Sequence, residues 1–155
     1  MLSNLLEAGE NVCLYDVPKA GKTSLVQQTL YNMRASGKPF TVAYVDVFNV
    51  RTKREFLKKF GGAVLRAAYS TPSDYASAIA RHLQGTHFVF DAAQFASKED
   101  IVCMNWDADD NDISMMASLP FRIAEESGMP MYVVFKEFQN VMQAEGFEDI
   151  FKCME

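Results

Sequence analysis

Several features are scarce or missing in this sequence of 155 residues, and each absence excludes a class of protein. No charged-then-apolar leader opens the chain and no apolar run approaches the roughly 18 residues of a membrane span, so we expect a cytoplasmic protein with no membrane contact. The three cysteines are odd in number and scattered, which favours reduced thiols over a disulfide framework. No cysteine or histidine pair has zinc-ligand spacing, and neither His82 nor His87 is predicted to bind a metal.

Positive charge is also limited. The net charge is −5 and the pI is about 5.1, which argues against a nucleic-acid-binding surface. The one dense basic run, from Lys53 to Lys59, is interpreted as the solvated face of a helix. A hydrophobic content of 49% and a charged content of 23% are typical of a globular protein, and the length predicts one domain over residues 1–155.

Predicted strands and helices alternate along the chain. Asn11–Tyr15 is a short, apolar, β-prone run, and a helix is predicted from Lys22. Phe40–Phe48 and Met131–Phe135 are near-continuous apolar runs, as expected of strands buried on both faces. This alternation predicts an α/β protein with a parallel sheet and crossover helices.

The middle of the chain carries helix-start signals and two further short strands. Thr52 and Glu55 form a predicted capping box, and Thr71 followed by proline starts a second helix. Thr86–Asp91 and Asp100–Asp107 are predicted to form a β-hairpin insertion. The remaining predicted elements are a helix from about Asn111, interrupted near Pro120 and ended by Gly128, and a final amphipathic stretch with Val141, Phe147, Ile150 and Phe151.

A phosphate-binding pattern, G-x-x-x-x-G-K-[ST], is largely matched where the first predicted strand gives way to a helix. Gly21 lets the backbone approach a ligand closely, Lys22 would reach the outer phosphates, and the Thr23 hydroxyl would ligate Mg²⁺. The unpaired N–H groups and the positive dipole at a helix start favour phosphate. Because a cation is mildly unfavourable there, a nucleotide site explains Lys22 better than stability alone.

Asp16 stands where this pattern has its first glycine. Aspartate tolerates the left-handed backbone better than most residues, so we expect the loop to form. Its carboxylate repels phosphate, whereas Pro18 and Lys19 stiffen the loop and offset part of the charge, so we predict weakened nucleotide affinity. The predicted nucleotide-binding residues are Asp16, Val17, Pro18, Lys19, Ala20, Gly21, Lys22, Thr23 and Ser24.

Three segments, NVCLYDVPKAGKTSL, YVDVFNVRT and FRIAEESGMPMYVVFKEFQNVM, resemble the P-loop ATPase domains of the archaeal-type AAA group of prokaryotic ATP-binding proteins. The resemblance runs from about Asn4 to Glu155. It implies a three-layer P-loop NTPase-like fold, a parallel sheet flanked by helices, here with the hairpin insertion. It also implies ATP and Mg²⁺ as cofactors, Lys22 as a catalytic phosphate contact and Glu137 as the base that orients the attacking water.

Lys136 falls where that family has its metal-associated aspartate. Three interpretations stay open: Lys136 replaces part of the Mg²⁺ charge, it excludes Mg²⁺ and leaves a dead site, or the strand is shifted so that Glu137 serves the metal. Because hydrolysis relies on the ion, we expect ATP binding with weak or lost hydrolysis. Asp46, at the end of its own predicted strand, is an alternative acid.

The chain ends one helix after Glu137, before two further core strands of that family, so we expect a fold that is incomplete at its C-terminus. Unpaired sheet edges favour an alternative function, a non-catalytic protein-interaction module on a decayed ATPase scaffold. Its partner would be a second copy or another protein, bound at a sheet edge or at the hairpin Phe88–Trp106. Nucleic acid contact is expected only through the missing regions. A small-molecule or nucleotide kinase is a third option. Such enzymes usually carry an arginine-rich lid, and the arginines of this sequence form no obvious one.

An acidic run precedes the helix predicted from Asn111. Asp107, Asp109 and Asn111 have the spacing of the first calcium ligands of an EF-hand loop. Asp112 replaces the glycine that such a loop needs at its sharp turn, which argues against calcium. We therefore predict that these acids cap the helix that follows.

Overall fold

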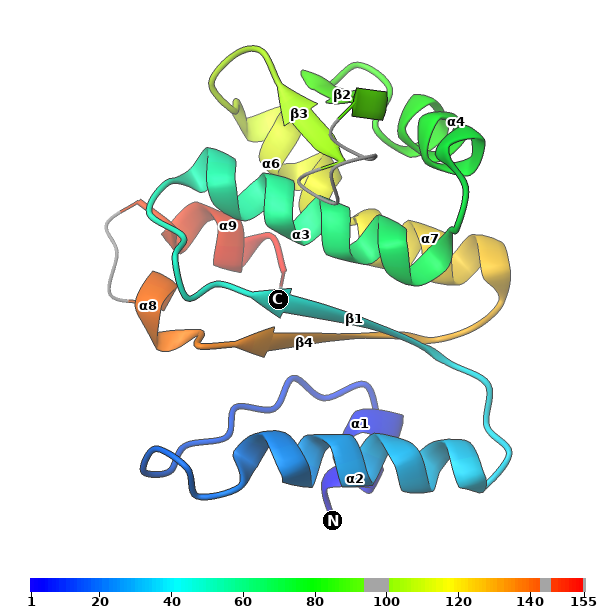
Figure 1. Cartoon of the computed structure of the whole chain (residues 1–155), viewed down its shortest axis with the longest axis vertical. Helices are drawn as coiled ribbons and strands as arrows, with labels where there is room; N and C mark the ends of the chain where they lie inside the picture. The colour runs from blue at the N-terminus through cyan, green and yellow to red at the C-terminus, as the bar shows by residue number, and fades with distance from the viewer. Residues whose placement is uncertain (94–100, 143–145, 155) are drawn as a thin grey trace. The chain divides into compact units, whose positions relative to one another are not determined.

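The computed structural model of this protein describes residues 1–93, 101–142 and 146–154 (Figure 1). It is a mixed α/β structure that divides into two compact units, Met1–Phe40 and Thr41–Glu155. The prediction of one domain over residues 1–155 stays a prediction. None of the helices formed by the described residues has both the length and the apolar character that crossing a bilayer requires.

The first unit contains two helices, α1 (Leu2–Glu7) and α2 (Lys22–Ala35). Helix α2 begins at Lys22, as its sequence pattern predicts, and is followed by Gly37 in the left-handed conformation at φ 85°. An ion pair of 2.6 Å joins Lys38 beyond α2 to Glu7 of α1. The helix prediction for this part of the chain is therefore confirmed.

The strand predicted over Asn11–Tyr15 is wrong. These residues form neither strand nor helix, and the side chains of Val12 and Tyr15 are exposed. A strand needs a neighbour for its backbone N–H and C=O groups, and Met1–Phe40 contains no strand with which it could pair. A short run of β-prone residues does not by itself predict a strand, because the preference of these residues for extended backbone does not supply a second strand with which to pair.

The second unit contains the sheets and the remaining helices. Its two small sheets are the parallel pair β1–β4 and the antiparallel pair β2–β3. The described elements are β1 (Thr41–Asp46), α3 (Lys53–Ala68), α4 (Pro72–His82), β2 (Phe88–Phe90), β3 (Val102–Met104), α6 (Asp110–Ala117), α7 (Leu119–Ser127), β4 (Met131–Lys136), α8 (Gln139–Met142) and α9 (Glu148–Lys152).

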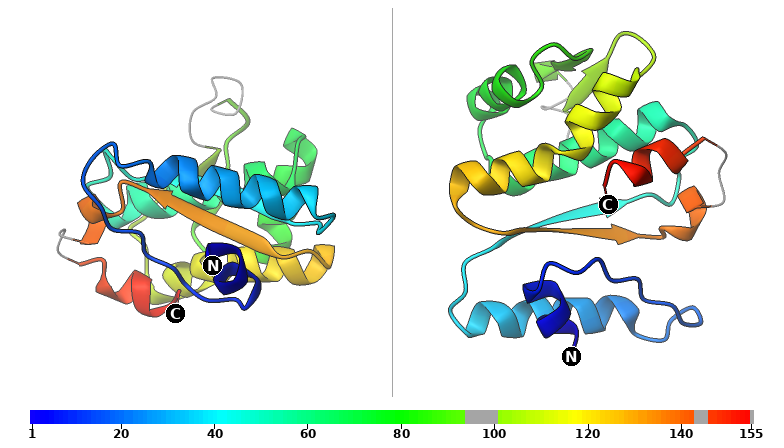
Figure 2. Two further views of the ribbon diagram at one scale, coloured as in Figure 1. Left: turned by 90° about the horizontal axis from the view of Figure 1, so that it is seen from below. Right: turned by 180° about the vertical axis from the view of Figure 1, so that it is seen from behind.

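Strands β1 and β4 run parallel, with Thr41 opposite Met131 and Asp46 opposite Lys136. Within the second unit, α3, α7 and α9 all lie on one side of this sheet (Figures 1 and 2). The predicted strands and their parallel pairing are thus confirmed.

The burial predicted for β1 is partly wrong, because only one set of its alternating side chains is enclosed. Ala43 and Val45 face the helices and are 1% exposed, whereas Tyr44 is 44% exposed. Successive side chains of a strand point to opposite faces, so a continuous apolar run does not by itself show that both faces are buried.

The helix-start signals of the second unit are confirmed. The Thr52 hydroxyl accepts a hydrogen bond from the Glu55 N–H, and the Glu55 carboxylate accepts one from the Thr52 N–H. At the start of α4 the Thr71 hydroxyl accepts a hydrogen bond from the Asp74 N–H, with Pro72 in the first turn. The predicted interruption near Pro120 separates α6 from α7, and Gly128 ends α7 in the left-handed conformation.

The antiparallel pairing of the predicted hairpin is confirmed, with Phe88 opposite Met104. Its strands are shorter than predicted, and Asp100 lies outside the described part of the chain. The side chains of Phe88 and Met104 are buried, whereas Trp106, just beyond β3, is 69% exposed. The final amphipathic stretch is divided into the short helices α8 and α9, with Gly146 at φ 85° between them, and residues 143–145 lie outside the described part of the chain.

Candidate functional site

In the first unit, the loop Asp16–Gly21 wraps around the ammonium group of Lys22. The Lys22 Nζ donates hydrogen bonds to the carbonyl oxygens of Asp16, at 2.8 Å, and Val17, at 3.0 Å. The Ala20 N–H donates to the same Val17 carbonyl at 3.2 Å. Two backbone oxygens of this segment therefore hold the Lys22 ammonium group, and its role as a phosphate-binding loop stays a prediction.

The left-handed positions of this loop differ from those expected. They are Lys19, at φ 65°, and Gly21, at φ 87°, and Asp16 does not have a positive φ. The Asp16 carboxylate instead accepts a hydrogen bond of 2.7 Å from the N–H of Val17. The replacement of glycine by aspartate at this position therefore requires no strained backbone, and only its charge opposes phosphate.

The N-terminus of α2 has an unneutralised positive end. Gly21 is its N-cap, no side chain caps it, and its first turn contains no acidic residue. Helices α3, α4 and α6 instead begin with a threonine or aspartate whose side chain accepts a backbone hydrogen bond. Thr23 and Ser24, in the first turn of α2, are exposed, so this helix start is open to an anion.

In the second unit, Asp46, Lys136 and Glu137 meet at the carboxyl end of the β1–β4 sheet. Asp46 is the register partner of Lys136, and the Val47 N–H donates to the Lys136 carbonyl at 3.1 Å. The Phe48 N–H donates to the Asp46 carboxylate at 3.0 Å. Parallel strands place their carboxyl ends side by side, which brings together two acids that lie far apart in sequence.

Glu137 has the left-handed conformation, with φ 58°, directly after β4. Non-glycine residues rarely adopt this conformation, and those that do are frequent at functional sites. Its carboxylate accepts a hydrogen bond of 2.6 Å from the Gln139 side-chain amide. The backbone turn therefore ends the strand and fixes the direction of the predicted catalytic carboxylate.

An open pocket of about 490 Å³ occupies this end of the sheet. The Lys59 Nζ in this pocket donates to the Asp46 carbonyl oxygen at 3.4 Å. Lys59 was interpreted from sequence as part of a solvated helix face, and only the packing of α3 against β1 shows that it reaches the site. The residues that line the pocket are Asp46, Phe48, Asn49, Lys59 and Glu137.

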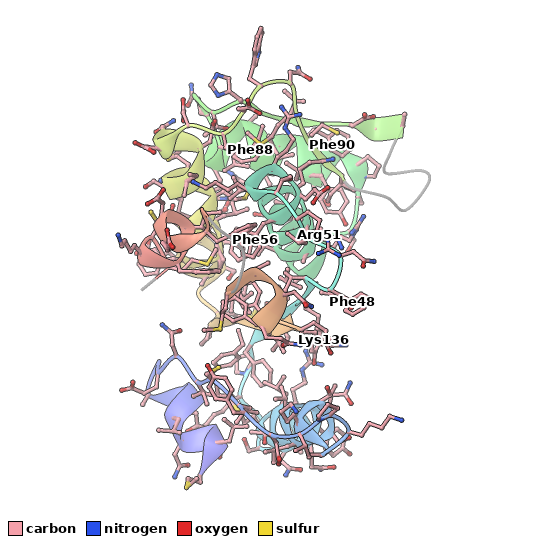
Figure 3. The ribbon with its side chains drawn as sticks, turned by 90° about the vertical axis from the view of Figure 1, so that its left-hand side faces the viewer. Phe48, Arg51, Phe56, Phe88, Phe90 and Lys136 are labelled. Atoms are coloured by element: carbon pink, nitrogen blue, oxygen red, sulfur yellow. The ribbon has the colours of Figure 1, made fainter. Side chains whose placement is uncertain are left out.

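The Lys136 ammonium group is directed toward an aromatic ring. Its Nζ lies 5.5 Å from the centroid of the exposed Tyr44 ring, within the range of a cation–π contact. Figure 3 labels Lys136 at the end of β4 and Phe48 after β1, with Arg51 just before the start of α3. The contact with Tyr44 gives the Lys136 ammonium group a partner other than the carboxylates of Asp46 and Glu137.

A second polar group, which sequence reasoning did not find, lies at the base of the hairpin. A ring nitrogen of His87 and carboxylate oxygens of Asp109 and Asp112 all lie within 4.8 Å of one another. The predicted capping role is confirmed for Asp109 and Asp112, which form the capping box of α6, whereas Asp107 pairs with Arg54. The pairing of Asp109 and Asp112 with His87 joins residues far apart in sequence, and no local pattern indicates it.

The interactions within this group change the pKa values of His87 and Asp112. The hydrogen bond to Asp112, together with the nearby charges of Asp112 and Asp109, raises the pKa of His87 above its ordinary value, although desolvation opposes this change. Burial raises the pKa of the Asp112 carboxyl, but hydrogen bonds from His87 and Asp109 outweigh it, so the net pKa is lowered. The two groups thus favour the ion pair of imidazolium and carboxylate.

The structure brings the predicted site residues together in two sets. The loop residues from Asp16 to Ser24 belong to the first unit, and Asp46, Lys136 and Glu137 belong to the second. Comparison of the chain with protein-family models, curated proteins and solved structures gives no match. The chemistry of the two sets is therefore the basis for assigning a function.

Proposed function

We propose that this protein binds ATP through the loop Asp16–Ser24 and hydrolyses it weakly or not at all, as a P-loop ATPase-type domain related to the archaeal-type AAA group. The observation that carries the proposal is the Lys22 ammonium group, held by loop carbonyls beside the uncapped start of α2. The three-layer P-loop fold implied by the resemblance is part of the same proposal.

The charge of the loop supports phosphate binding despite Asp16. The charged side chains from Asp16 to Lys22 are one aspartate and two lysines, at positions 16, 19 and 22, so the loop carries a net charge of +1. Phosphate oxygens would take the place of the carbonyl oxygens that now accept from Lys22, and the free N–H groups of the helix start would add to the attraction. In this proposal the Thr23 hydroxyl is the Mg²⁺ ligand.

Weak hydrolysis follows from the acids and lysines of the second unit. Glu137 is the proposed base, and Asp46 is an alternative acid for the metal, since Lys136 occupies the position of the expected aspartate. The ammonium groups of Lys59 and Lys136 both lie near this end of the sheet, and positive charge there disfavours a divalent cation. Without a well-held ion, charge developing on the transferred phosphoryl group is poorly neutralised.

We expect ATP to raise the thermal stability of the protein, and Lys22→Ala to abolish that rise. Ligand at about 100 times Kd stabilises a protein by about 2.7 kcal/mol, which is readable in a melting curve followed by circular dichroism. Lys38→Ala is the matched control, because Lys38 is also in the first unit but lies beyond the far end of α2. Melts with and without Mg²⁺ show whether the ion takes part in binding.

A wild-type melting temperature that ATP leaves unchanged would contradict ATP binding. An equal loss of the ATP effect in Lys38→Ala would show that the charge of the unit, and not the loop, attracts the nucleotide.

Any ATP hydrolysis by the wild-type protein is expected to fall about 100-fold or more in Glu137→Gln, the usual contribution of a positioned general base. The ATP-induced stabilisation should remain, because the substitution changes no loop residue. Phosphate release is the measurement, and Glu125→Gln, at an exposed position of α7, is the control. Unchanged turnover in Glu137→Gln would remove Glu137 from the mechanism.

One observation favours the alternative, a protein-interaction module. Among the described residues, β1 and β4 pair only with each other, so each strand has an edge without a ladder partner. Such edges are sites of strand addition by another chain. The hairpin also exposes Val89 and Trp106. If ATP has no effect on stability, a concentration-dependent sedimentation coefficient would support self-association through such surfaces.

A further inference from the structure

A buried carboxylate joins the hairpin to the first turn of α6. Asp112 is fully buried, and its Oδ1 accepts the backbone N–H of His87 at 2.8 Å. Its Oδ2 accepts the N–H of Asp109 at 3.0 Å and lies 2.8 Å from the His87 Nδ1. Three hydrogen bonds thus converge on one carboxylate, two of them from a residue at the start of the hairpin.

We propose that His87 and Asp112 form a pH-sensitive lock, which ties the start of the β2–β3 hairpin to the first turn of α6 when His87 is protonated and loosens when His87 is neutral. A protonated imidazole makes a charge-assisted hydrogen bond to the carboxylate, about twice as strong as a neutral one. When His87 loses its proton, Asp112 becomes a buried charge without a counter-charge, which is costly. The side chain of His87 is 42% exposed, so its proton exchanges with solvent while the hairpin stays in place.

His87 is a basic group that the structure places directly against the Asp112 carboxylate. Asp109 lies 3.8 Å from the His87 Nδ1 and adds to the attraction for a proton. Strand β3 carries Cys103, whose thiol donates to Asp91 at the other end of the hairpin. Other basic side chains on the described elements around the hairpin form ion pairs of their own. Arg54 of α3 pairs with Asp107, and both Arg81 and His82 of α4 pair with Glu126 of α7.

The direction of the pH effect follows from the changes in the pKa values of His87 and Asp112. The pKa of His87 is raised above 6.5, so its stabilising contribution is complete below that pH and is lost as the pH rises through the raised value. The pKa of Asp112 is lowered below 3.8, so its contribution is present above that pH and is lost as the pH falls through the lowered value. The lock is therefore closed in mild acid and loosens as the pH rises through the raised pKa of His87.

Amide hydrogen exchange of β2 and β3, corrected for the intrinsic pH dependence of exchange, tests the lock directly. We expect protection to fall by about two- to tenfold between about pH 6 and about pH 8.5, the usual difference between a charge-assisted and a neutral hydrogen bond. Amides in the middle of α3 should keep their protection. The NMR titration of the His87 ring should have its midpoint above 6.5.

Two variants separate the lock from general pH effects. His87→Gln cannot titrate, so hairpin protection should be independent of pH and close to the wild-type value at high pH. Asp110→Asn removes an exposed acid of the same helical turn and should behave like the wild type. Equal wild-type protection at both pH values, or a His87 midpoint at or below 6.5, would overturn the proposal even if His87→Gln fails to fold.

Discussion

Phe56→Ala is expected to lower the free energy of unfolding of the second unit by about 3–5 kcal/mol, the usual cost of removing a buried phenylalanine ring. The side chain is fully buried on α3. Its ring stacks on Phe60 and on Phe135 of β4, with centroids 6.0 and 5.9 Å away. It also meets the edges of Phe147 and Phe151 near the end of the chain, at 5.8 and 6.2 Å. One ring therefore joins three parts of the chain that are distant in sequence.

Urea unfolding followed by circular dichroism measures this cost. Phe121→Ala is the matched control, because Phe121 of α7 is 65% exposed and should change stability by no more than about 0.5 kcal/mol. Equal losses in the two variants would show that the aromatic cluster is not the core of the second unit. The result bears on function, because α3 carries Lys59 to the pocket and β4 ends at Glu137.

Val45→Asp is expected to destabilise the second unit by about 4 kcal/mol or more. Losses of this size are typical of the most severe single substitutions, such as one that buries an unpaired charge. Val45 is 1% exposed on the inner face of β1, opposite Phe135 in register. A carboxylate at this position would be removed from water and placed in the hydrophobic core. Its protonation would reduce the cost, so the loss should be smaller in acid than at neutral pH.

Val89→Asp makes the same chemical change at an exposed strand position, where 42% of the residue is accessible. We expect a cost of about 1 kcal/mol or less, the span of strand preferences measured in host proteins. Free energies from urea unfolding compare the two variants. Similar costs at both positions would mean that β1 does not bury alternate side chains, and the assignment of Asp46 to the pocket end of the strand would lose its support.

These stability measurements also separate two explanations for a negative ATP result. A protein that unfolds cooperatively, loses several kcal/mol with Phe56→Ala and does not respond to ATP would be a folded module whose loop is a relic. A protein that does not unfold cooperatively would leave the ATP result without meaning, since a site needs a folded scaffold. The core variants are therefore informative before any assay of turnover.

Helix starts in this protein follow from the sequence because the interactions that fix them are local. Thr52 and Glu55, three residues apart, satisfy each other's backbone groups without help from the rest of the chain. Asp109 and Asp112 do the same for α6. The sequence also determined the loop around Lys22, since its turn and its hydrogen bonds span only a few residues.

Pairing between distant residues was decided by the tertiary structure. The β-prone run at Asn11–Tyr15 is no strand, whereas Thr41–Asp46 finds a partner in Met131–Lys136. The contact of His87 with Asp112 has the same character, because it depends on how the start of the hairpin meets the first turn of α6. A hydrogen bond within one helical turn is set by local residue order, whereas a ladder, a buried ion pair or a pocket requires two segments whose meeting depends on the packing of the whole unit.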